Sequence, residues 1–180
     1  MTSSSAARQL PAPRVAGASY RIAVVCLGNI CRSPIGEVVL TSKIEQAGLA
    51  GRVEVVSAGT GGWHVGNPMD RRAAAVLTAH GYDASGHRAK RFEAAWFEDC
   101  DLVLAMDADN LSDIRAAAPD ATATNRVALF REFDPRAGDG DRDVPDPYYG
   151  GDDGFDTVLT MVERTAAVIV ATLDDQVARH

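Results

Sequence analysis

The chain has 180 residues, of which 46% are hydrophobic, so it is long enough for one well-buried domain and short for two. Its formal net charge of −7 argues against nucleic acid as a partner, because such binding relies on basic patches that neutralise phosphates. No apolar run reaches the ~20 residues that a transmembrane helix requires, so we expect no membrane association.

Residues 1–19 contain serines, prolines and scattered arginines, and they lack the apolar core of a signal peptide. We expect these residues to form a disordered N-terminal extension, followed by one domain over residues 20–180. The three cysteines, an odd number in a chain without an export signal, indicate reduced thiols rather than a disulfide framework. A cytoplasmic location is therefore expected.

The first predicted element covers residues 21–25, where an apolar run is typical of a strand buried on both faces. Cys26 follows it directly, and Arg32 lies six positions further along. Ser33 is predicted as the N-cap of a helix, and Pro34 suits a first turn that needs no N–H there. The loop between strand and helix would therefore gather backbone N–H groups at a helix N-terminus, where anions bind.

The residues of this loop predict phosphate chemistry. Gly28 permits a tight turn, and Asn29 tolerates left-handed backbone geometry. Helix-terminal donors and a nearby arginine stabilise a thiolate, so Cys26 is a candidate nucleophile beneath the anion. Arg32 presents a planar fork of donors that matches two phosphate oxygens. A buried cysteine at a strand end is often only a small hydrophobe, but the spacing and the neighbouring residues favour the catalytic interpretation.

The remainder of the chain alternates strands with helices. In chain order, the patterns predict a helix over residues 34–48, a strand over 53–57, a helix over 71–80, a strand over 101–106, a helix over 108–117, a strand over 126–129 and a helix over 156–177. Right-handed connections between such elements give a parallel sheet with helices on both faces. Ligands bind these sheets at the carboxyl ends of the strands, and Cys26 stands at such an end.

Two stretches carry a resemblance to a known family. Residues 26–34 read Cys-Leu-Gly-Asn-Ile-Cys-Arg-Ser-Pro, and residues 146–150 read Asp-Pro-Tyr-Tyr-Gly. Together they resemble the low-molecular-weight protein tyrosine phosphatases, and the similarity runs from about residue 20 to the C-terminal helix. This resemblance implies a single-domain, three-layer α/β fold with a four-stranded parallel sheet in the order 2-1-3-4. It also implies hydrolysis of phosphotyrosine and small aryl phosphates through a cysteinyl-phosphate intermediate.

Asp146 is the candidate general acid. Phosphoryl transfer from an aryl phosphate to a thiolate needs a proton on the leaving oxygen. Asp146 lies between two prolines that hold the chain out of helix, but composition alone does not distinguish it from the other aspartates of residues 133–156. The resemblance assigns Asp146 this role and implies that it later takes a proton from water.

The resemblance also implies an aromatic mouth to the pocket. Tyr148 and Tyr149 would form its walls, and both are candidate phosphorylation sites for a tyrosine kinase. Trp63, which glycines precede, and Leu27 would line the same pocket and contact a phenyl ring. Read without the resemblance, Trp63 is more typical of a core anchor, and the two tyrosines are loop aromatics.

Several further residues are expected to shape or support the phosphate loop. By resemblance, His87 supports Asn29 through hydrogen bonds, Ser33 donates to the thiolate, and Asp107 orients Arg32. Asp107 is equally consistent with an N-cap of the helix predicted from residue 108, and His87 with an ordinary surface histidine. The full predicted set for phosphate binding and loop support is Leu27, Gly28, Asn29, Ile30, Cys31, Ser33, His87 and Asp107.

Cys31 lies five residues after Cys26 and inside the same loop. Such a neighbour can capture an oxidised thiol as a disulfide before irreversible oxidation, and the resembled family is known for this protection. We therefore expect a redox-sensitive enzyme.

Three alternative functions share parts of this pattern. A thiol-dependent arsenate reductase would need two relay cysteines, whereas only Cys100 remains outside the loop. A non-catalytic phospho-ligand module would not need both Cys26 and Asp146. A protein arginine phosphatase of the same fold stays open, although Trp63 and the two tyrosines favour an aromatic substrate.

The expected partners are phosphotyrosine-containing proteins, with inorganic phosphate or other oxyanions as inhibitors. The sequence has no Gly-Lys-Ser/Thr phosphate loop and no Cys/His cluster with metal-ligand spacing. We therefore expect neither a metal nor another cofactor, because positioned charges and a covalent intermediate suffice.

Overall fold

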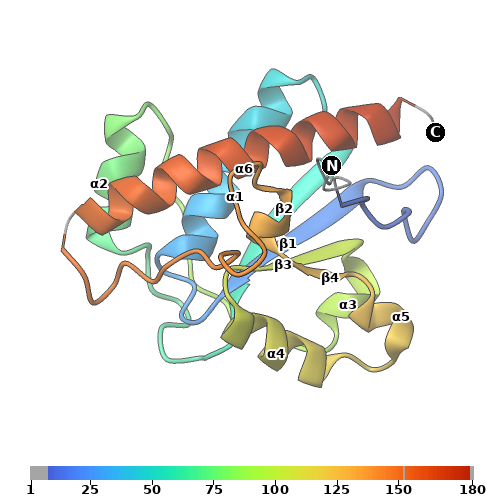
Figure 1. The fold of residues 1–180 in the computed structure, drawn as a ribbon, viewed down its shortest axis with the longest axis horizontal. Helices are drawn as coiled ribbons and strands as arrows, with labels where there is room; N and C mark the ends of the chain where they lie inside the picture. The colour runs from blue at the N-terminus through green and yellow to red at the C-terminus, as the bar shows by residue number, and fades with distance from the viewer. Residues whose placement is uncertain (1–7, 152, 179–180) are drawn as a thin grey trace.

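Within residues 8–151 and 153–178, which the computed structural model describes, four parallel strands form one sheet (Figure 1). The strands are β1 (Tyr20–Cys26), β2 (Val53–Gly59), β3 (Leu102–Ala105) and β4 (Val127–Leu129). Their order is β2-β1-β3-β4, which confirms the predicted order 2-1-3-4. Because Tyr20 pairs with Val53 and Cys26 with Gly59, the carboxyl ends of β1 and β2 lie side by side.

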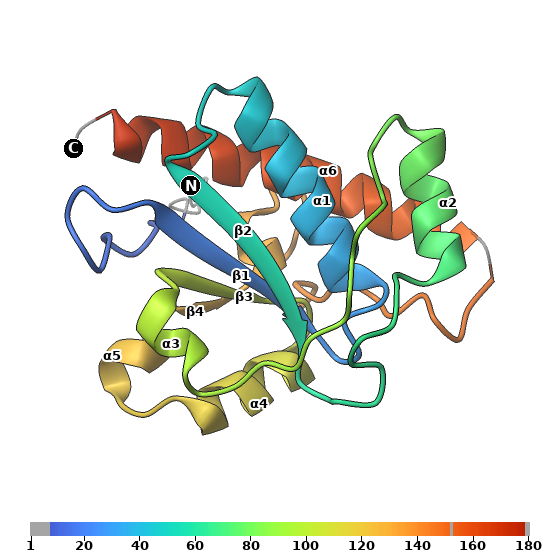
Figure 2. The same ribbon diagram turned by 180° about the vertical axis from the view of Figure 1, so that it is seen from behind.

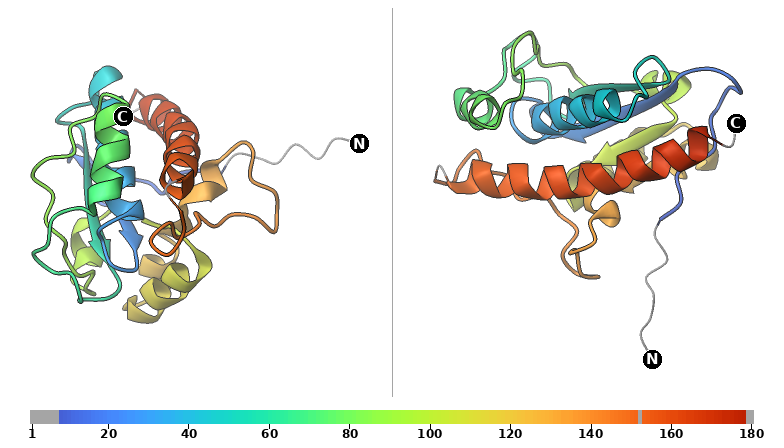
Figure 3. Two further views of the ribbon diagram at one scale, coloured as in Figure 1. Left: turned by 90° about the vertical axis from the view of Figure 1, so that its left-hand side faces the viewer. Right: turned by 90° about the horizontal axis from the view of Figure 1, so that it is seen from above.

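Helices cover both faces of the sheet. They are α1 (Arg32–Gln46), α2 (Arg71–Ala79), α3 (Trp96–Asp99), α4 (Ala108–Ala117), α5 (Ala121–Thr124) and α6 (Asp153–Val177), with a 3₁₀ helix η1 (Phe130–Phe133) after β4. The long helices α1 and α6 lie side by side along one face (Figure 3). The shorter α3, α4 and α5 gather on the other face (Figure 2), so the domain has three layers.

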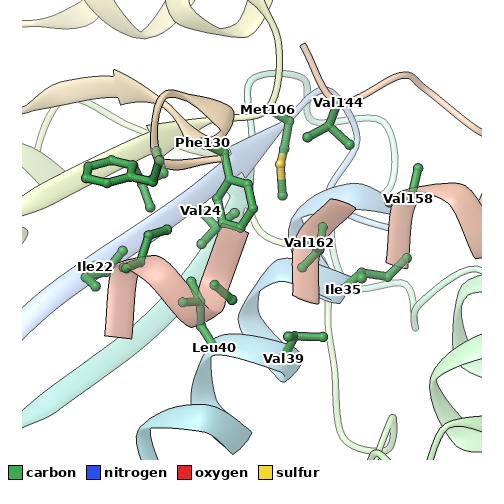
Figure 4. Close-up of a cluster of buried hydrophobic side chains, with 14 of the residues drawn as sticks. Ile22, Val24, Ile35, Val39, Leu40, Met106, Phe130, Val144, Val158 and Val162 are labelled. Carbon is green, nitrogen blue, oxygen red and sulfur yellow. The ribbon is translucent and has the colours of Figure 1, made fainter. Parts of the chain in front are cut away.

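Alternate residues of β1 enter two separate cores. Ile22 and Val24 pack under α1 and α6, whereas Ala23 and Val25 face the layer of α3, α4 and α5. All four side chains are fully buried, which explains the continuous apolar run in the sequence. Figure 4 shows the first core, where side chains of β1, α1 and α6 meet Phe130.

The start of α1 differs from the prediction. Arg32 is its first residue and Cys31 occupies the N-cap position, so the prediction of Ser33 as N-cap is wrong. The Ser33 hydroxyl lies 3.0 Å from Cys26 Sγ and donates to the carbonyl of Ala58 at 3.3 Å. Pro34 remains in the first turn, where a missing N–H breaks no helical hydrogen bond.

The other element bounds lie within a few residues of the predicted ones, and α4 has the predicted bounds, residues 108–117. The sequence patterns did not predict α3, α5 or η1. Each has only four residues. An apolar period cannot be recognised over so short a segment.

Residues 8–19 contain neither helix nor strand, yet they form hydrogen bonds with the rest of the domain. The carbonyl of Pro11 accepts from Tyr20 Oη at 3.0 Å and from Gln176 Nε2 at 3.2 Å. The backbone N–H of Arg14 donates to Asp101 Oδ1 at 2.7 Å. This part of the chain therefore differs from the expected disordered extension, while residues 1–7 lie outside the described residues. Among the residues described, no helix is long and apolar enough to cross a membrane.

A buried ion cluster ties the segment after η1 to α6. Asp134 accepts from Arg164 at 2.7 and 2.8 Å, from Arg131 Nε at 2.9 Å and from the N–H of Arg136 at 2.9 Å. Burial alone would raise the pKa of Asp134, but these donors hold it well below its usual range. Arg131 also donates to the carbonyl of Asp143 at 2.9 Å, so the cluster reaches the loop that precedes Asp146.

Replacing Asp134 with asparagine should lower the free energy of unfolding at pH 7 by about 3 kcal/mol, because Arg131 loses its buried counterion. The wild-type carboxylate has a folded-state pKa below its unfolded value of ~3.9. Its stabilisation is therefore present above ~pH 4 and is lost as the pH falls toward the folded pKa. Urea unfolding should show a difference between the two proteins that narrows from pH 5 to about pH 2.5.

The matched control is Asp139→Asn, because Asp139 is fully exposed and pairs with Arg142 at the surface. We expect a change of less than about 0.5 kcal/mol for this variant. Equal unfolding free energies for Asp134→Asn and the wild type at pH 7 would contradict the structural role of the cluster.

Candidate active site

The segment from Cys26 to Arg32 connects the end of β1 to the start of α1. Asn29 has a φ of 57°, in the left-handed region that asparagine tolerates. Its Nδ2 donates to Ser33 Oγ at 2.8 Å and to Ser57 Oγ at 3.0 Å, and its Oδ1 accepts from the N–H of Lys90 at 2.9 Å. Both polar atoms of the buried amide thus have partners, and these bonds fix the loop from inside.

His87 lies against the same turn. Its Nε2 is 2.7 Å from the carbonyl oxygen of Asn29, and its ring is largely buried. The structure therefore brings together the histidine and asparagine that the resemblance pairs. Ser57, on β2, was not predicted as a supporting residue, because its link to Asn29 depends on strand pairing and has no local sequence signal.

Gly59 lets the end of β2 approach this loop closely. A side chain there would place its Cβ 2.6 Å from the carbonyl oxygen of Leu27, which is too close for any residue with a Cβ. The N–H groups of Thr60 and Gly61 donate to the carbonyls of Cys26 and Leu27, each at 2.9 Å. The main chain at the end of β2 thus holds the first part of the loop.

The Cys26 thiol lies at the base of the loop and is buried. Its Sγ lies 3.0 Å from Ser33 Oγ, close enough for the hydroxyl to donate to a thiolate in place of the carbonyl of Ala58. Because Ser33 itself accepts from Asn29, the support of the loop extends to the sulfur.

Arg32 is held by an acid and a carbonyl. Its Nη1 donates to Asp107 Oδ2 at 2.5 Å and to the carbonyl of Val144 at 3.0 Å. Burial alone would lower the pKa of Arg32, but the charges of Cys26, Asp107 and Asp146 raise it above its ordinary value, so the guanidinium stays charged. Asp107 also caps α4, because its Oδ1 accepts from the N–H of Asn110 at 2.8 Å. Both interpretations of Asp107 therefore describe real contacts.

Asp146 stands above the loop. Its Oδ2 lies 3.6 Å from Arg32 Nη2, and its Oδ1 accepts from the N–H of Tyr148 at 3.0 Å. The side chain is about one third exposed, so a substrate oxygen can reach it. Among the described aspartates of residues 133–156, Asp146 is the one that lines the cavity at Cys26.

That cavity has a volume of about 270 Å³ and contains the three predicted catalytic side chains. Its mouth is formed by Trp63, Tyr148 and Tyr149, which are 72%, 39% and 88% exposed. Trp63 is therefore not a core anchor, which is what its sequence context suggested without the family resemblance. The two tyrosine rings meet edge to face at 4.9 Å. His64, next to Trp63, was not predicted. The lining residues are Cys26, Leu27, Gly28, Ile30, Cys31, Arg32, Trp63, His64, Asp146, Tyr148 and Tyr149.

The two remaining cysteines lie in different places. Cys31 lines the cavity, and burial, together with the charges of Asp70 and Cys26, raises its pKa well above the ordinary value. Cys100 precedes β3, whose residue Leu102 pairs with Ile22 near the amino end of β1. Cys26 ends β1, so Cys100 lies near the opposite end of the sheet and is not placed to relay electrons from this cavity.

A cysteine and an arginine around one loop, at the carboxyl end of a parallel strand, are typical of the class of cysteine-dependent phosphatases. The model of the family "Low molecular weight phosphotyrosine protein phosphatase" matches residues 21–179. The chain belongs to this family.

Known proteins of this family are similar along nearly their whole length. A low molecular weight protein-tyrosine-phosphatase of Streptomyces coelicolor is 48% identical over 159 residues, which cover 88% of this chain and 96% of the relative. The crystal structure of a protein tyrosine phosphatase from Entamoeba histolytica superimposes with a TM-score of 0.82 at 30% identity, covering 87% of this chain and 98% of its own. The tyrosine phosphatase Wzb from Escherichia coli K30, solved with sulphate, gives a TM-score of 0.73 at 32% identity, covering 85% and 97%.

Proposed function

We propose that this protein hydrolyses phosphotyrosine in proteins, and small aryl phosphates, with Cys26 as the nucleophile. The observation that carries the proposal is the meeting of Cys26, Arg32 and Asp146 in one cavity with an aromatic mouth. Each of these three side chains matches one requirement of the chemistry: a nucleophile, a charge clamp and a proton donor.

In the first step, the Cys26 thiolate attacks phosphorus while the bond to the phenolic oxygen breaks. Arg32 and the loop N–H groups hold the remaining phosphate oxygens, and Asp146 gives its proton to the leaving oxygen. In the second step, water attacks the phosphocysteine, and the Asp146 carboxylate accepts a proton from that water. Inorganic phosphate leaves, and the thiolate and the acid are restored. The supporting network of Asn29, Ser33, His87 and Asp107 keeps this geometry in place, as the loop residues 27–31 do.

The mouth of the cavity supports an aromatic leaving group. Trp63, Tyr148 and Tyr149 offer exposed ring surface next to the phosphate loop, and a stacked aromatic pair contributes about 1 kcal/mol. The E. coli relative was solved in complex with sulphate, which supports the binding of an oxyanion by this chain as well. Inorganic phosphate should therefore inhibit competitively.

The direct test is a comparison of three phosphopeptides with one sequence, carrying phosphotyrosine, phosphoserine or phosphoarginine. Release of inorganic phosphate should give the highest kcat/KM for phosphotyrosine. A higher value for phosphoarginine would overturn the tyrosine assignment while leaving the nucleophile and clamp unaffected. An Asp146→Ala variant used as a trap in native lysate would then identify the phosphoprotein partners.

We propose further that residues 20–180 form the catalytic domain, that the protein acts in the cytoplasm, and that a tyrosine kinase modifies Tyr148 or Tyr149. The exposure of Tyr149 supports access by a kinase. Mass spectrometry of the protein purified from its own cells, after cell fractionation, tests both the location and the modification.

Cys31→Ser should turn recoverable inactivation by peroxide into permanent inactivation. Peroxide oxidises the Cys26 thiolate to a sulfenic acid; the Cys31 thiol then attacks that sulfur, water leaves, and a disulfide forms that a thiol reductant can reverse. Most wild-type activity should return after peroxide and then dithiothreitol, and much less should return in the variant. Cys100→Ser is the control, because Cys100 lies away from the cavity. Unchanged recovery in Cys31→Ser would disprove the protective disulfide.

A further inference from the structure

Arg72, in the first turn of α2, contacts the loop that carries Asp146. Its Nη2 donates to the carbonyl of Tyr148 at 3.2 Å. The N–H of the same tyrosine donates to Asp146 Oδ1 at 3.0 Å. One residue of the loop therefore connects the guanidinium to the carboxylate of the acid.

A carboxylate and two aromatic rings contact the Arg72 side chain, which is 37% exposed. Its Nε and Nη2 donate to the two carboxylate oxygens of Asp70 at 3.2 and 3.1 Å, which is a bidentate pair. Its guanidinium carbon lies 4.7 Å from the ring centroid of Phe155 and 5.5 Å from that of Tyr148. Phe155 is buried in the core on α6, so the guanidinium is fixed against a rigid element.

Asp70 also contacts the phosphate loop. Its backbone N–H donates to the carbonyl of Ile30 at 2.9 Å, and Ile30 lines the cavity together with Cys26. Asp70 thus contacts the loop that carries Cys26, and Arg72 contacts the loop that carries Asp146.

We propose that Arg72 is a positioning residue that fixes Asp146 over the phosphate loop through the main chain of Tyr148. This inference rests on the proposed function, because it assumes that Asp146 donates a proton to the leaving oxygen. Arg72 does not touch the substrate in this role. Replacing Arg72 should therefore slow the hydrolysis of substrates whose leaving group needs the proton. Substrates whose leaving group departs without a proton should be affected much less.

The test compares kcat/KM of Arg72→Leu with that of the wild type on aryl phosphates of graded leaving-group acidity. On phenyl phosphate or a phosphotyrosine peptide, which need the acid, we expect a loss of about tenfold, since a small displacement of a catalytic group costs up to ~10² in rate. On p-nitrophenyl phosphate, whose leaving group is more acidic, the loss should be smaller. A merely structural loss of active protein would lower every substrate equally.

A double variant shows whether Arg72 acts through Asp146. Adding Arg72→Leu to Asp146→Ala should cause no further loss on the phenolic substrates, because the group that Arg72 positions is already absent. A full additional tenfold loss in the double variant would overturn the proposal. Asp70→Asn, which keeps an N-cap for α2 but removes the charge that orients Arg72, should reproduce part of the effect.

Arg72→Leu should fold, because the N–H of residue 72 still donates to Asp70 Oδ1 and Asp70 still caps α2. The neighbouring exposed Arg71 provides the matched control as Arg71→Gln. If the wild type hydrolyses no aryl phosphate, the proposed function fails. If the wild type is active and Arg72→Leu matches Arg71→Gln on every leaving group, the positioning role alone fails.

Discussion

Cys26→Ser should reduce the turnover of phosphotyrosine peptides and aryl phosphates by at least ~10⁴-fold, because the first step loses its nucleophile. A serine hydroxyl is far less acidic than a thiol and stays protonated at neutral pH, so it is a poor nucleophile at this position. The measurement is phosphate release with excess enzyme over long incubation, which detects slow residual turnover.

The same variant should still bind anions. Arg32 and the loop N–H groups remain, so inorganic phosphate should bind with a Kd within about threefold of the wild-type value by calorimetry, since one removed contact of modest energy shifts affinity little. Cys100→Ser, at the other end of the sheet, should keep full activity. Substantial turnover by Cys26→Ser would contradict the covalent mechanism.

Asp146→Ala should lower kcat/KM for phosphotyrosine peptides by about 10²–10³-fold, in the range that general acids contribute. p-Nitrophenyl phosphate should lose much less, because its leaving group departs without a proton. A series of aryl phosphates should therefore give a steeper dependence of rate on leaving-group acidity in the variant than in the wild type.

Asp139→Ala is the matched control for that series, because it is an exposed aspartate of the same long loop. It should keep the wild-type dependence on the leaving group. Equal losses on acidic and phenolic leaving groups in Asp146→Ala would contradict its assignment as the acid and would instead indicate a general disturbance of the site.

The phosphate loop could be predicted because its signals are local. An apolar strand, Cys26, Arg32 and Pro34 stand within a few residues of one another, and the structure places them at the junction of β1 and α1. The helix boundary there could not be predicted, because the Ser33 hydroxyl could either cap the helix or bond to other parts of the site. Its hydroxyl lies 3.0 Å from Cys26 Sγ and donates to the carbonyl of Ala58 on β2, and these tertiary contacts outweigh the usual preference of serine for the N-cap.

The candidate acid, Asp146, could not be singled out from the residues alone, because long-range contacts position its loop. The N–H of Val144 donates to the carbonyl of Met106 at 2.7 Å, and the carbonyl of Val144 accepts from Arg32. Asp143 accepts from the N–H of Ala108 at 3.0 Å, at the start of α4. These bonds join parts of the chain that are far apart in sequence, so only the family motif distinguished Asp146 from its neighbours.

A glycine in the first part of α1 is likewise explained by tertiary contacts that have no local sequence signal. Gly36 is a poor helix former, but a Cβ there would lie 2.9 Å from Met106 Cε and 3.0 Å from Val24 Cγ1. A side chain at this position would displace the end of Met106 and crowd Val24, so glycine allows α1 to pack closely on β1. Helix propensity alone cannot reveal this.

The hydrogen bonds of the Asn29 side chain have a consequence for how the enzyme meets its substrate. Because folding itself supplies the contacts that hold the left-handed turn, the loop has its final shape before any anion arrives. Binding then carries little entropic cost of ordering the receptor, and even a small dianion can bind without help from the rest of a substrate protein. The phosphate group and the surrounding peptide can therefore contribute to recognition almost independently. The phosphate provides affinity for the loop, and the peptide determines specificity among substrate proteins.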